Sequence, residues 1–430
     1  MKKILALVLA AALLLSAAQA VFAASPVEVS RTAEQTDDLP PDGALSPALR
    51  QEILQYNHVI GTNAFAPSYQ FTDADPIMEV ADQILAWGSN MIKFTAGSDD
   101  SVVDRILEGR DFDYVFIWYR SEAVFKDGYS EEEAREDYDA FYGFTQKLLR
   151  TYDGTGKQFY LGHWEGDWYY TDNYNGNQET VSETVTRGMI DWMNNRQKAV
   201  DDARRDTPHS NVDVWNYLEI NRPMDAMNKG YDRVVNRVLP YTNVDYVSYS
   251  AYDCMNESTR TIRKVIDYIC RNLPEKSGVP GPRVFIGEAA APASRFGYDD
   301  GRHCEANLRI ITKFLRCDVR FFLYWEMYCN ETLPDGRANG YWLIDSDGNQ
   351  TRLYRVLQEA FRDGKEYVET FAKEHGRVPT NQEYRGWLLR RPAFAKARIG
   401  VFFEDIYATF RSLIGRLAAL FRLPDTGKRS

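Results

Sequence analysis

The sequence predicts an α/β protein that folds as a closed (β/α)₈ barrel with a C-terminal helical extension. Short apolar segments alternate with amphipathic helical segments over about 300 residues, and this unit occurs eight times. Such alternation is typical of a parallel sheet, and eight units favour closure into a barrel. An open, doubly wound sheet is the alternative. Its nucleotide-binding form is disfavoured because no glycine-rich loop follows the first predicted strand.

The predicted strands are short apolar runs. They are Asn57–Asn63, Asn90–Thr95, Tyr114–Tyr119, Gln158–Glu165, Val212–Ile220, Val244–Ala251, Arg283–Glu288 and Arg320–Glu326. The helical segments between them include Pro76–Trp87, Ser130–Thr151, Val181–Asp206 and Thr259–Asn272. Near 341–349, Asp347-Gly348-Asn349 predicts a tight hairpin-like turn before the last barrel helix. We assign residues 47–365 to this domain.

The N-terminus predicts export. Lys2 and Lys3 precede an apolar run from Ile4 to Leu15, and small residues follow up to Ser25. This is the layout of a secretory signal peptide, which we assign to residues 1–24. A membrane anchor is the alternative, but the apolar run is short for a span. Residues 25–46 are polar and predict a disordered linker. We expect a secreted or cell-envelope-associated protein.

Composition limits the classes of partner and cofactor. The net charge of −11 argues against nucleic acid as a partner of the main body. Aromatic residues make up 13% of the chain, and they serve equally well to stack on sugars or to fill a core. Five cysteines leave disulfide pairing open. No Cys-x-x-Cys or His-rich pattern occurs, so we expect no catalytic metal and no cofactor.

Residues 366–430 are predicted to form a basic, amphipathic helical tail. From Tyr384 onward the chain has ten Lys or Arg against three Asp or Glu, and Thr380 and Glu383 have capping-box spacing. Six apolar residues recur at helical intervals: Phe403, Ile406, Phe410, Leu413, Leu417 and Leu420. Such a helix could contact an anionic membrane surface or a cell-envelope partner. Alternatively it docks on the barrel or pairs with a helix at Trp387–Arg398.

Polar residues at strand ends locate the candidate site, because barrel enzymes place their active sites at the carboxyl ends of the strands. Glu288 follows the apolar stretch Val284–Ile286, where a carboxylate is costly unless it is paired or open to a cleft. Glu165 ends the fourth strand beside aromatic residues. Asp167 and Glu219 compete with Glu165 for a catalytic role.

Two carboxylates at strand ends are the minimum set for hydrolysing a glycosidic bond. In the retaining mechanism they lie about 5–5.5 Å apart; one attacks the anomeric carbon, and the other protonates the leaving oxygen and later activates water. A carboxyl surrounded by apolar rings keeps its proton to higher pH. Because Trp164 and Trp168 flank Glu165, we expect Glu165 to be the acid/base and Glu288 the nucleophile.

This arrangement resembles the clan A glycoside hydrolases, the TIM-barrel group that includes family 5 cellulases and mannanases. In that clan the acid/base glutamate ends strand four and the nucleophilic glutamate ends strand seven, and Glu165 and Glu288 match those positions. Gly287-Glu288 resembles the clan's Gly-Glu nucleophile motif. The resemblance covers about residues 55–360, and it implies a β-linked poly- or oligosaccharide as substrate.

The resemblance also implies roles for residues around the two glutamates. Tyr252 stands where the clan has a tyrosine that hydrogen-bonds the nucleophile. Trp325 stands where the clan has a tryptophan that forms the floor of the −1 sugar subsite. Lys93 replaces an arginine that supports the nucleophile. The expected substrate-binding residues are Lys93, Trp118, His163, Trp164, Tyr252 and Trp325. Other aromatic residues near strand ends are Trp168, Tyr169, Tyr170, Tyr328, Tyr341 and Trp342.

Two departures from the clan pattern keep a second interpretation open. Trp164 replaces the asparagine that usually precedes the acid/base and binds the sugar 2-hydroxyl, with His163 as a possible substitute. Ser250 replaces a histidine two residues before the strand-six tyrosine. A catalytically inactive, glycan-binding barrel is therefore the alternative to an active hydrolase. The sequence leaves the oligomeric state open.

Overall fold

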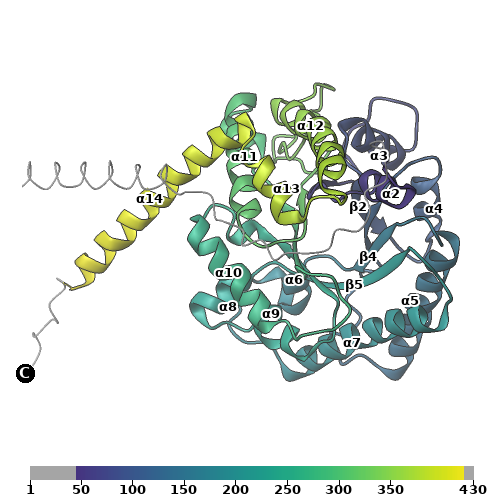
Figure 1. Cartoon of the computed structure of the whole chain (residues 1–430). Coiled ribbons are helices and arrows are strands. Elements are labelled where there is room, and N and C mark those ends of the chain that lie inside the picture. Colours follow the sequence, from purple (N-terminus) through teal and green to yellow (C-terminus); the bar gives the residue numbers. More distant parts are fainter. Residues whose placement is uncertain (1–44, 421–430) are drawn as a thin grey trace, which may run out of the picture. The chain divides into compact units, whose positions relative to one another are not determined.

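The chain forms a closed barrel of eight parallel strands (Figure 1). The computed structural model describes residues 45–420; the predicted signal peptide, nearly all of the predicted linker and residues 421–430 lie outside this range. The strands are β1 (Ile60–Asn63), β2 (Met91–Ala96), β3 (Tyr114–Tyr119), β4 (Gln158–Gly162), β5 (Asp213–Ile220), β6 (Tyr246–Ser250), β7 (Val284–Ala289) and β8 (Phe322–Tyr324). They pair in chain order and β1 also pairs with β8, so the predicted (β/α)₈ fold is confirmed.

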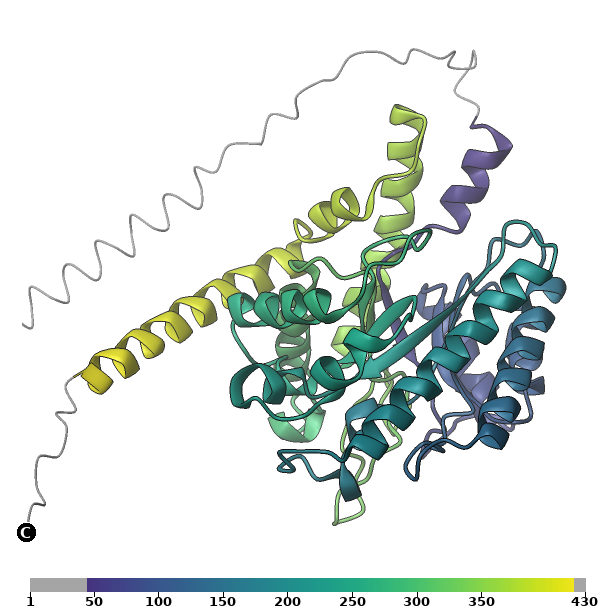
Figure 2. The same cartoon turned by 90° about the horizontal axis from the view of Figure 1, so that it is seen from below.

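Helices surround the barrel, as Figures 1 and 2 show. The longer ones are α2 (Pro47–Leu54), α3 (Pro76–Trp87), α4 (Ser101–Leu107), α5 (Glu131–Thr151), α7 (Glu183–Asp206), α10 (Thr259–Asn272), α11 (Asp300–Leu315) and α12 (Arg352–His375). Short helices lie in the loops: α6 (Gly166–Tyr170), α8 (Pro223–Lys229), α9 (Val234–Arg237) and the 3₁₀ turns Asp172–Tyr174, Leu239–Tyr241, Ala251–Asp253 and Ala293–Phe296.

Local sequence signals set the helix ends. Ser130 accepts a hydrogen bond from the Glu133 N–H, and the Glu133 side chain accepts one from the Ser130 N–H, so a capping box begins α5. Ser258 caps α10 in a similar way. Gly88 and Gly376 follow α3 and α12 with φ values of 106° and 67°, a left-handed conformation that glycine adopts without steric cost.

Aromatic side chains fill the barrel below the candidate site. Phe116 of β3 stacks on Tyr160 of β4 with ring centroids 4.6 Å apart, and Phe116 also contacts Phe285 of β7 at 5.2 Å. Contacts between strands on opposite sides of the barrel can form only through its interior. Phe285 and Tyr160 are fully buried, so the lower barrel is a packed core that supports the polar residues above it.

The C-terminal region consists of α12, α13 (Asn381–Leu388) and α14 (Pro392–Leu420). α12 runs through residue 365, where the sequence analysis placed the end of the barrel domain. The capping box of Thr380 and Glu383 begins α13, as predicted. The single helix predicted at Trp387–Arg398 is wrong, because the chain turns between α13 and α14. Pro392 lacks the N–H needed to continue α13, but it suits the first turn of a new helix.

The N-terminal part of α14 docks on the barrel. Lys396 forms an ion pair with Glu305 of α11 at 2.8 Å, and Phe394 and Val401 are fully buried. One of the two alternatives for the tail, docking on the barrel, is thus correct for this part of the helix. Within residues 45–420, no helix has both the length and the apolar character needed to cross a membrane.

All five cysteines lie within the described residues, and none is bonded to another. Cys254, Cys304, Cys317 and Cys329 are buried, and only Cys270 is exposed. Burial raises the pKa of the Cys317 thiol to about 11 and that of Cys304 to about 12, which keeps both protonated and unreactive near neutral pH.

Candidate active site

A pocket of about 430 Å³ opens at the carboxyl ends of the barrel strands. Its lining comes from the segments that follow β4 through β8: Trp164, Glu165, Trp168, Asn221, Arg222, Tyr252, Asp253, Glu288, Trp325, Glu331 and Tyr341. The two glutamates singled out in the sequence therefore face one opening, although more than a hundred residues separate them along the chain. This is the position that barrel enzymes use for catalysis.

Glu288 projects from β7 and is held by a buried lysine. The Lys93 Nζ lies 3.3 Å from Glu288 Oε1 and 2.9 Å from Glu219 Oε2. Lys93 and Glu219 are completely buried, and Glu288 is 3% exposed. The lysine thus joins two carboxylates from different strands and fixes the side chain of Glu288 at the bottom of the pocket.

Glu219 faces the interior of the barrel rather than the pocket. Its carboxylate accepts hydrogen bonds from Ser248 at 2.8 Å, from Ser250 at 3.1 Å and from the Trp118 indole at 3.4 Å, in addition to the Lys93 contact. With both oxygens occupied by donors, Glu219 is a positioning group for Lys93. Its candidacy as the catalytic acid is not supported. Ser250, which stands where the clan has a histidine, therefore serves this buried carboxylate.

A steric constraint explains why a glycine, Gly287, precedes Glu288. A Cβ at Gly287 would lie 1.9 Å from the Ser248 hydroxyl oxygen and 3.3 Å from Glu219 Oε2. The polar group beneath Glu288 therefore occupies the space that any larger residue would need. Gly287 also contributes its carbonyl oxygen, which accepts hydrogen bonds from Lys93 and from Asn63, each at 3.3 Å.

Glu165 lies on the opposite side of the pocket, just after β4. It is 8% exposed and immediately precedes the short helix α6, so the chain turns sharply at this residue. Trp164 and Trp168, on either side of it in the sequence, also line the pocket. Within residues 45–420, no cationic side chain forms an ion pair with Glu165, whereas Glu288 has Lys93.

The surroundings of the two carboxyls raise both pKa values to different extents. Burial raises the pKa of Glu165 well above its ordinary value, and the charges of Glu288 and Glu219 raise it further. Burial also raises the pKa of Glu288, to about 8, but Lys93 acts in the opposite direction. Because the Lys93 ammonium contacts Glu288 and not Glu165, Glu288 loses its proton first and Glu165 keeps its proton longer.

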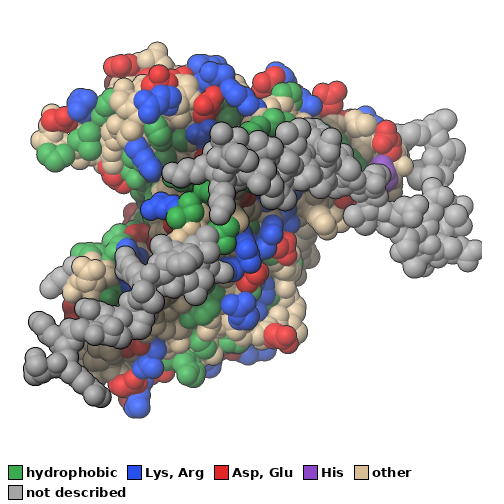
Figure 3. Space-filling model, turned by 90° about the vertical axis from the view of Figure 1, so that its left-hand side faces the viewer, with side chains coloured by type: hydrophobic (Ala, Val, Ile, Leu, Met, Phe, Trp, Pro, Cys, Tyr) green, Lys and Arg blue, Asp and Glu red, His purple; other side chains and the backbone are tan. Residues whose placement is uncertain are grey.

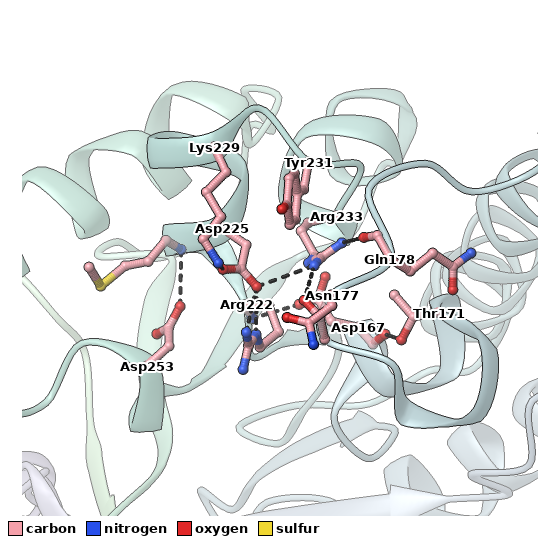
Figure 4. Close-up of polar contacts among 12 residues, drawn as sticks. Asp167, Thr171, Asn177, Gln178, Arg222, Asp225, Lys229, Tyr231, Arg233 and Asp253 are labelled. Carbon is pink, nitrogen blue, oxygen red and sulfur yellow. Dashed lines mark hydrogen bonds and ion pairs between the residues drawn. The ribbon is translucent and has the colours of Figure 1, made fainter.

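Asp167, the other competitor for the acid role, ties loops together instead (Figure 4). Its carboxylate accepts hydrogen bonds from the backbone N–H groups of Asn221, Arg222 and Val234, each at 2.8 Å. It is completely buried and does not line the pocket. Asp167 therefore holds the segment after β5 against α6. This contact also orients Arg222, which lines the pocket and whose guanidinium donates to Asp225.

Three of the six predicted substrate-binding residues line the pocket: Trp164, Tyr252 and Trp325. Burial raises the pKa of Tyr252 far above its ordinary value, and the charge of Glu288 adds to this effect, which is consistent with a phenol close to that carboxylate. The Trp325 indole is 8% exposed and packs against Phe65 with ring centroids 5.1 Å apart. Trp168 and Tyr341, two of the other aromatic residues near strand ends, also line the pocket.

Lys93 and His163 are completely buried and do not line the pocket, so their predicted contact with substrate needs correction. Trp118 does not line the pocket either, but it is 7% exposed and its ring centroid lies 6.4 Å from that of Trp325, so its contact with substrate stays a prediction. Lys93 lies under Glu288, with its ammonium 4.4 Å from the centre of a Trp118 ring, and both residues support the site from below. His163 is completely buried. Its Nδ1 lies 2.7 Å from the Trp164 carbonyl oxygen, and burial lowers its pKa to about 3. A neutral histidine facing the core does not replace the missing asparagine.

The sequence analysis missed Asn221, Arg222, Asp253 and Glu331 as pocket residues. Asn221 and Arg222 directly follow β5, so the rule that polar residues follow strand ends could have found them. Glu331 lies in the loop after β8, five residues beyond the predicted end of that strand at Glu326. Only the folded loop brings it to the pocket, where the Asn339 amide donates to it at 2.9 Å.

A second, larger hollow of about 660 Å³ lies beside the hairpin near 341–349 and is lined by Tyr69, Tyr298 and Trp342, among others. It contains neither of the paired glutamates. Residues 45–420 contain no group of three His, Cys, Asp or Glu side chains arranged to hold a metal ion.

No protein-family model and no curated protein matches this chain. Among solved structures it is similar to a family 39 glycoside hydrolase from the gut symbiont Bacteroides cellulosilyticus WH2, with a TM-score of 0.48, 11% identity, and coverage of 71% of this chain and 64% of that chain. It is also similar to an exo-β-1,4-mannosidase from Opitutaceae bacterium strain TAV5, with a TM-score of 0.48, 12% identity, and coverage of 72% of this chain and 60% of that chain. A family 5 xyloglucan-specific endo-β-1,4-glucanase from a metagenomic library is similar with a TM-score of 0.43, 12% identity, and coverage of 72% of this chain and 98% of that chain.

The chain spans less than two thirds of the length of the first two of these proteins. The first and third belong to families 39 and 5 of the clan that the sequence resembles. At 11–12% identity the likeness concerns the fold of the barrel.

Proposed function

We propose that the protein is a retaining β-glycoside hydrolase, exported from the cell, with Glu165 as general acid/base and Glu288 as nucleophile. The observation that carries this proposal is the difference between the two carboxyls of one pocket. Glu288 contacts a buried ammonium, whereas Glu165 lies among aromatic rings and forms no ion pair within the described residues. One carboxylate is thus prepared to be charged, and the other is prepared to hold a proton.

In the first step, a carboxylate oxygen of Glu288 attacks the anomeric carbon and forms an ester bond to the sugar. The bond from that carbon to the leaving oxygen breaks, and Glu165 transfers its proton to this oxygen. Lys93, 3.3 Å from Glu288 Oε1, favours the ionised form of Glu288 before this step. As the ester forms, the negative charge of Glu288 disappears, so Lys93 then has Glu219 as its charged partner.

In the second step, the Glu165 carboxylate takes a proton from a water molecule. The water oxygen attacks the anomeric carbon, the ester bond to Glu288 breaks, and the Glu288 carboxylate is restored. Neutralisation of Glu288 in the intermediate removes a charge that raises the pKa of Glu165. The pKa of Glu165 therefore falls once the ester has formed. Glu165 releases its proton in the first step and stays ionised to act as the base in the second.

The charges of the pocket favour a neutral sugar over an acidic one. Glu165, Glu288, Asp253 and Glu331 all line it, whereas Arg222, the one cationic side chain in its lining among residues 45–420, is already bound to Asp225. A uronic acid or sulfated sugar would meet these carboxylates without a free positive partner. The aromatic side chains that line the pocket can stack on the apolar faces of neutral pyranose rings.

The buried position of His163 favours the second candidate, an inactive glycan-binding barrel, because it removes the expected substitute for the missing asparagine. The side-chain amide of Asn221 can take the place of the missing asparagine. Asn221 lines the pocket, and its Oδ1 accepts a hydrogen bond from the Asp167 N–H at 3.0 Å, which leaves its NH₂ group to donate. We assign to Asn221 the hydrogen bond to a sugar hydroxyl that strengthens in the transition state.

Mechanism-based trapping tests the proposed function directly. A set of activated 2-deoxy-2-fluoro-β-glycosides of neutral sugars should inactivate the chain, and peptide mass spectrometry should find the sugar on Glu288. The variant Glu331→Gln is the matched control, because it removes another carboxylate of the same pocket and should still be labelled. Absence of labelling across the set, together with retained binding of β-glycans by Glu288→Gln, would establish the inactive barrel instead.

The pH profile of activity should depend on Glu219, a residue that does not face the substrate. Activity rises with pH as Glu288 loses its proton and falls as Glu165 loses its own. The Glu219 charge raises the pKa of both groups. Glu219→Gln should therefore move both limbs of the kcat/KM profile to lower pH, while the amide oxygen can still accept from Ser248 and the amide NH₂ can donate to the Ser250 hydroxyl oxygen.

The control for this prediction is Asp137→Asn. Asp137 is also a buried carboxylate with a buried cationic partner, Arg196 at 2.9 Å, but it lies outside the pocket. This variant should lose stability and leave the profile in place. A profile that does not move in Glu219→Gln would show that Glu219 has only a structural role.

A further inference from the structure

One helix of the protein carries most of its exposed large apolar side chains. Of ten such residues in the described part of the chain, six lie on α14 and are between 51% and 68% exposed: Ile399, Phe403, Tyr407, Phe410, Leu413 and Ile414. We call this set the α14 stripe. Single exposed apolar residues are common on protein surfaces, but a continuous group on one helix indicates an interaction surface.

The stripe occupies one side of the helix. At about 100° per residue its six side chains fall within a sector of about 120°. The opposite side is the one that docks on the barrel, where Phe394, Ala397 and Val401 are buried. The stripe therefore faces away from the barrel, and no part of the described chain covers it.

The acidic residues of α14 are already used by the barrel. Glu404 pairs with Arg309 at 3.0 Å and with Lys313 at 2.8 Å, and Asp405 accepts a hydrogen bond from the Thr259 N–H at 2.8 Å. These contacts hold the part of α14 around Glu404 and Asp405 on the barrel, and they neutralise the negative charges of these two residues.

The chain after Asp405 is basic. From residue 406 to the end it contains Arg411, Arg416, Arg422, Lys428 and Arg429 against the single acid Asp425. Arg411 is exposed and lies beside the stripe in sequence. The side of the molecule from which α14 projects presents both hydrophobic and basic side chains (Figure 3). The free part of the helix thus combines apolar area with positive charge.

We propose that α14 binds along the surface of an anionic lipid bilayer, with the stripe inserted at the level of the headgroups. A helix in the membrane plane needs an apolar face and flanking Lys or Arg side chains that reach anionic lipid headgroups. The body of the protein is acidic, so the attraction comes from this helix alone and keeps the barrel off the surface. The hydrolase would then act next to a membrane.

A second copy of the chain fits the stripe less well. The spacing alone would allow a coiled coil, because Phe403 and Phe410, like Tyr407 and Ile414, are seven residues apart. The charges argue against it, because pairing two such helices in parallel would bring their basic C-terminal segments together. The bilayer satisfies both the apolar stripe and the positive charge, and a copy of the helix satisfies only the first.

Vesicle sedimentation tests the proposal. The chain from Ser25 onward keeps every described element and lacks the apolar N-terminal run, which would otherwise contribute to binding. It should sediment with vesicles of phosphatidylcholine and phosphatidylglycerol in equal amounts, less with phosphatidylcholine alone, and less at high salt. The triple variant Phe403→Ser/Tyr407→Ser/Phe410→Ser should bind on the order of 100-fold more weakly.

The matched control is Leu54→Ser/Tyr241→Ser, which removes two equally exposed apolar side chains, at 78% and 66%, from other parts of the surface. It should bind vesicles as the parent does. Failure of the parent to bind anionic vesicles, or equal binding by parent and triple variant, would overturn the proposal. So would a parent dimer in analytical ultracentrifugation that the triple variant loses, because the stripe would then bind a second copy. None of these measurements depends on hydrolysis, so they stand or fall separately from the proposed activity.

Discussion

Replacing Glu165 by alanine is expected to slow hydrolysis of substrates with poor leaving groups by about 10²–10⁴-fold. A sugar or alkyl alcohol leaves as an unstable alkoxide unless a proton arrives during bond cleavage, and Glu165 supplies this proton. An activated aryl glycoside leaves without that help, so its first step should change far less. The measurement is kcat/KM for a series of β-glycosides, plotted against the pKa of the leaving alcohol, where the variant should show the steeper slope.

Azide gives this experiment a positive control. The cavity left by the missing carboxyl admits a small anion, which needs no base to attack the glycosyl ester on Glu288. Azide should therefore speed turnover of activated substrates by Glu165→Ala and give a β-glycosyl azide. The comparison variant Glu331→Ala removes a more exposed carboxylate of the same pocket and should show neither effect. If Glu165→Ala slowed good and poor leaving groups equally, Glu165 would not be the acid.

The barrel could be predicted because its signals are local. Each strand is an apolar run followed by polar residues, and each long helix has a periodic apolar face, so Tyr114–Tyr119 and Thr259–Asn272 were predicted with their observed bounds. Other ends depended on tertiary contacts. The fourth strand was predicted to continue to Glu165, but it ends at Gly162, where a Cβ would lie 2.2 Å from the Tyr217 ring of β5.

The two glutamates of the pocket could be predicted because strand order alone brings the ends of β4 and β7 to one face of a barrel. The support beneath them could not. Glu219 receives its partners from β2, β3 and β6, and nothing local distinguishes it from a carboxylate that faces a cleft. His163 illustrates the converse case. It adjoins Trp164, which lines the pocket, yet its own ring turns toward Trp192 in the core, with ring centroids 5.0 Å apart.

Replacing Lys93 by methionine should destabilise the protein by about 3–5 kcal/mol, the usual cost of removing one member of a buried ion pair. Lys93 and Glu219 are both completely buried, so no water replaces the lost ammonium. Chemical denaturation near neutral pH, compared with the parent, measures this loss. The control is Lys147→Met. Lys147 also contacts two carboxylates, Asp100 at 2.9 Å and Asp104 at 2.7 Å, but its side chain is 34% exposed, and its removal should cost less than about 1 kcal/mol.

The pH dependence of this loss separates a charge effect from a packing effect. Lys93 lowers the pKa of Glu288, so without it the pKa of Glu288 in the folded state rises further above the unfolded value. The folded variant then binds more protons than the unfolded chain, and its stability falls as the pH rises above the ordinary range of a carboxyl. The gap between variant and parent should therefore stay level up to about pH 8, where the Glu288 carboxyl of the parent loses its proton, and widen above that pH. A gap that stays constant through this range would mean that Lys93 stabilises the barrel by filling space, and the assignment of Lys93 as the group that favours the ionised form of Glu288 would fail with it.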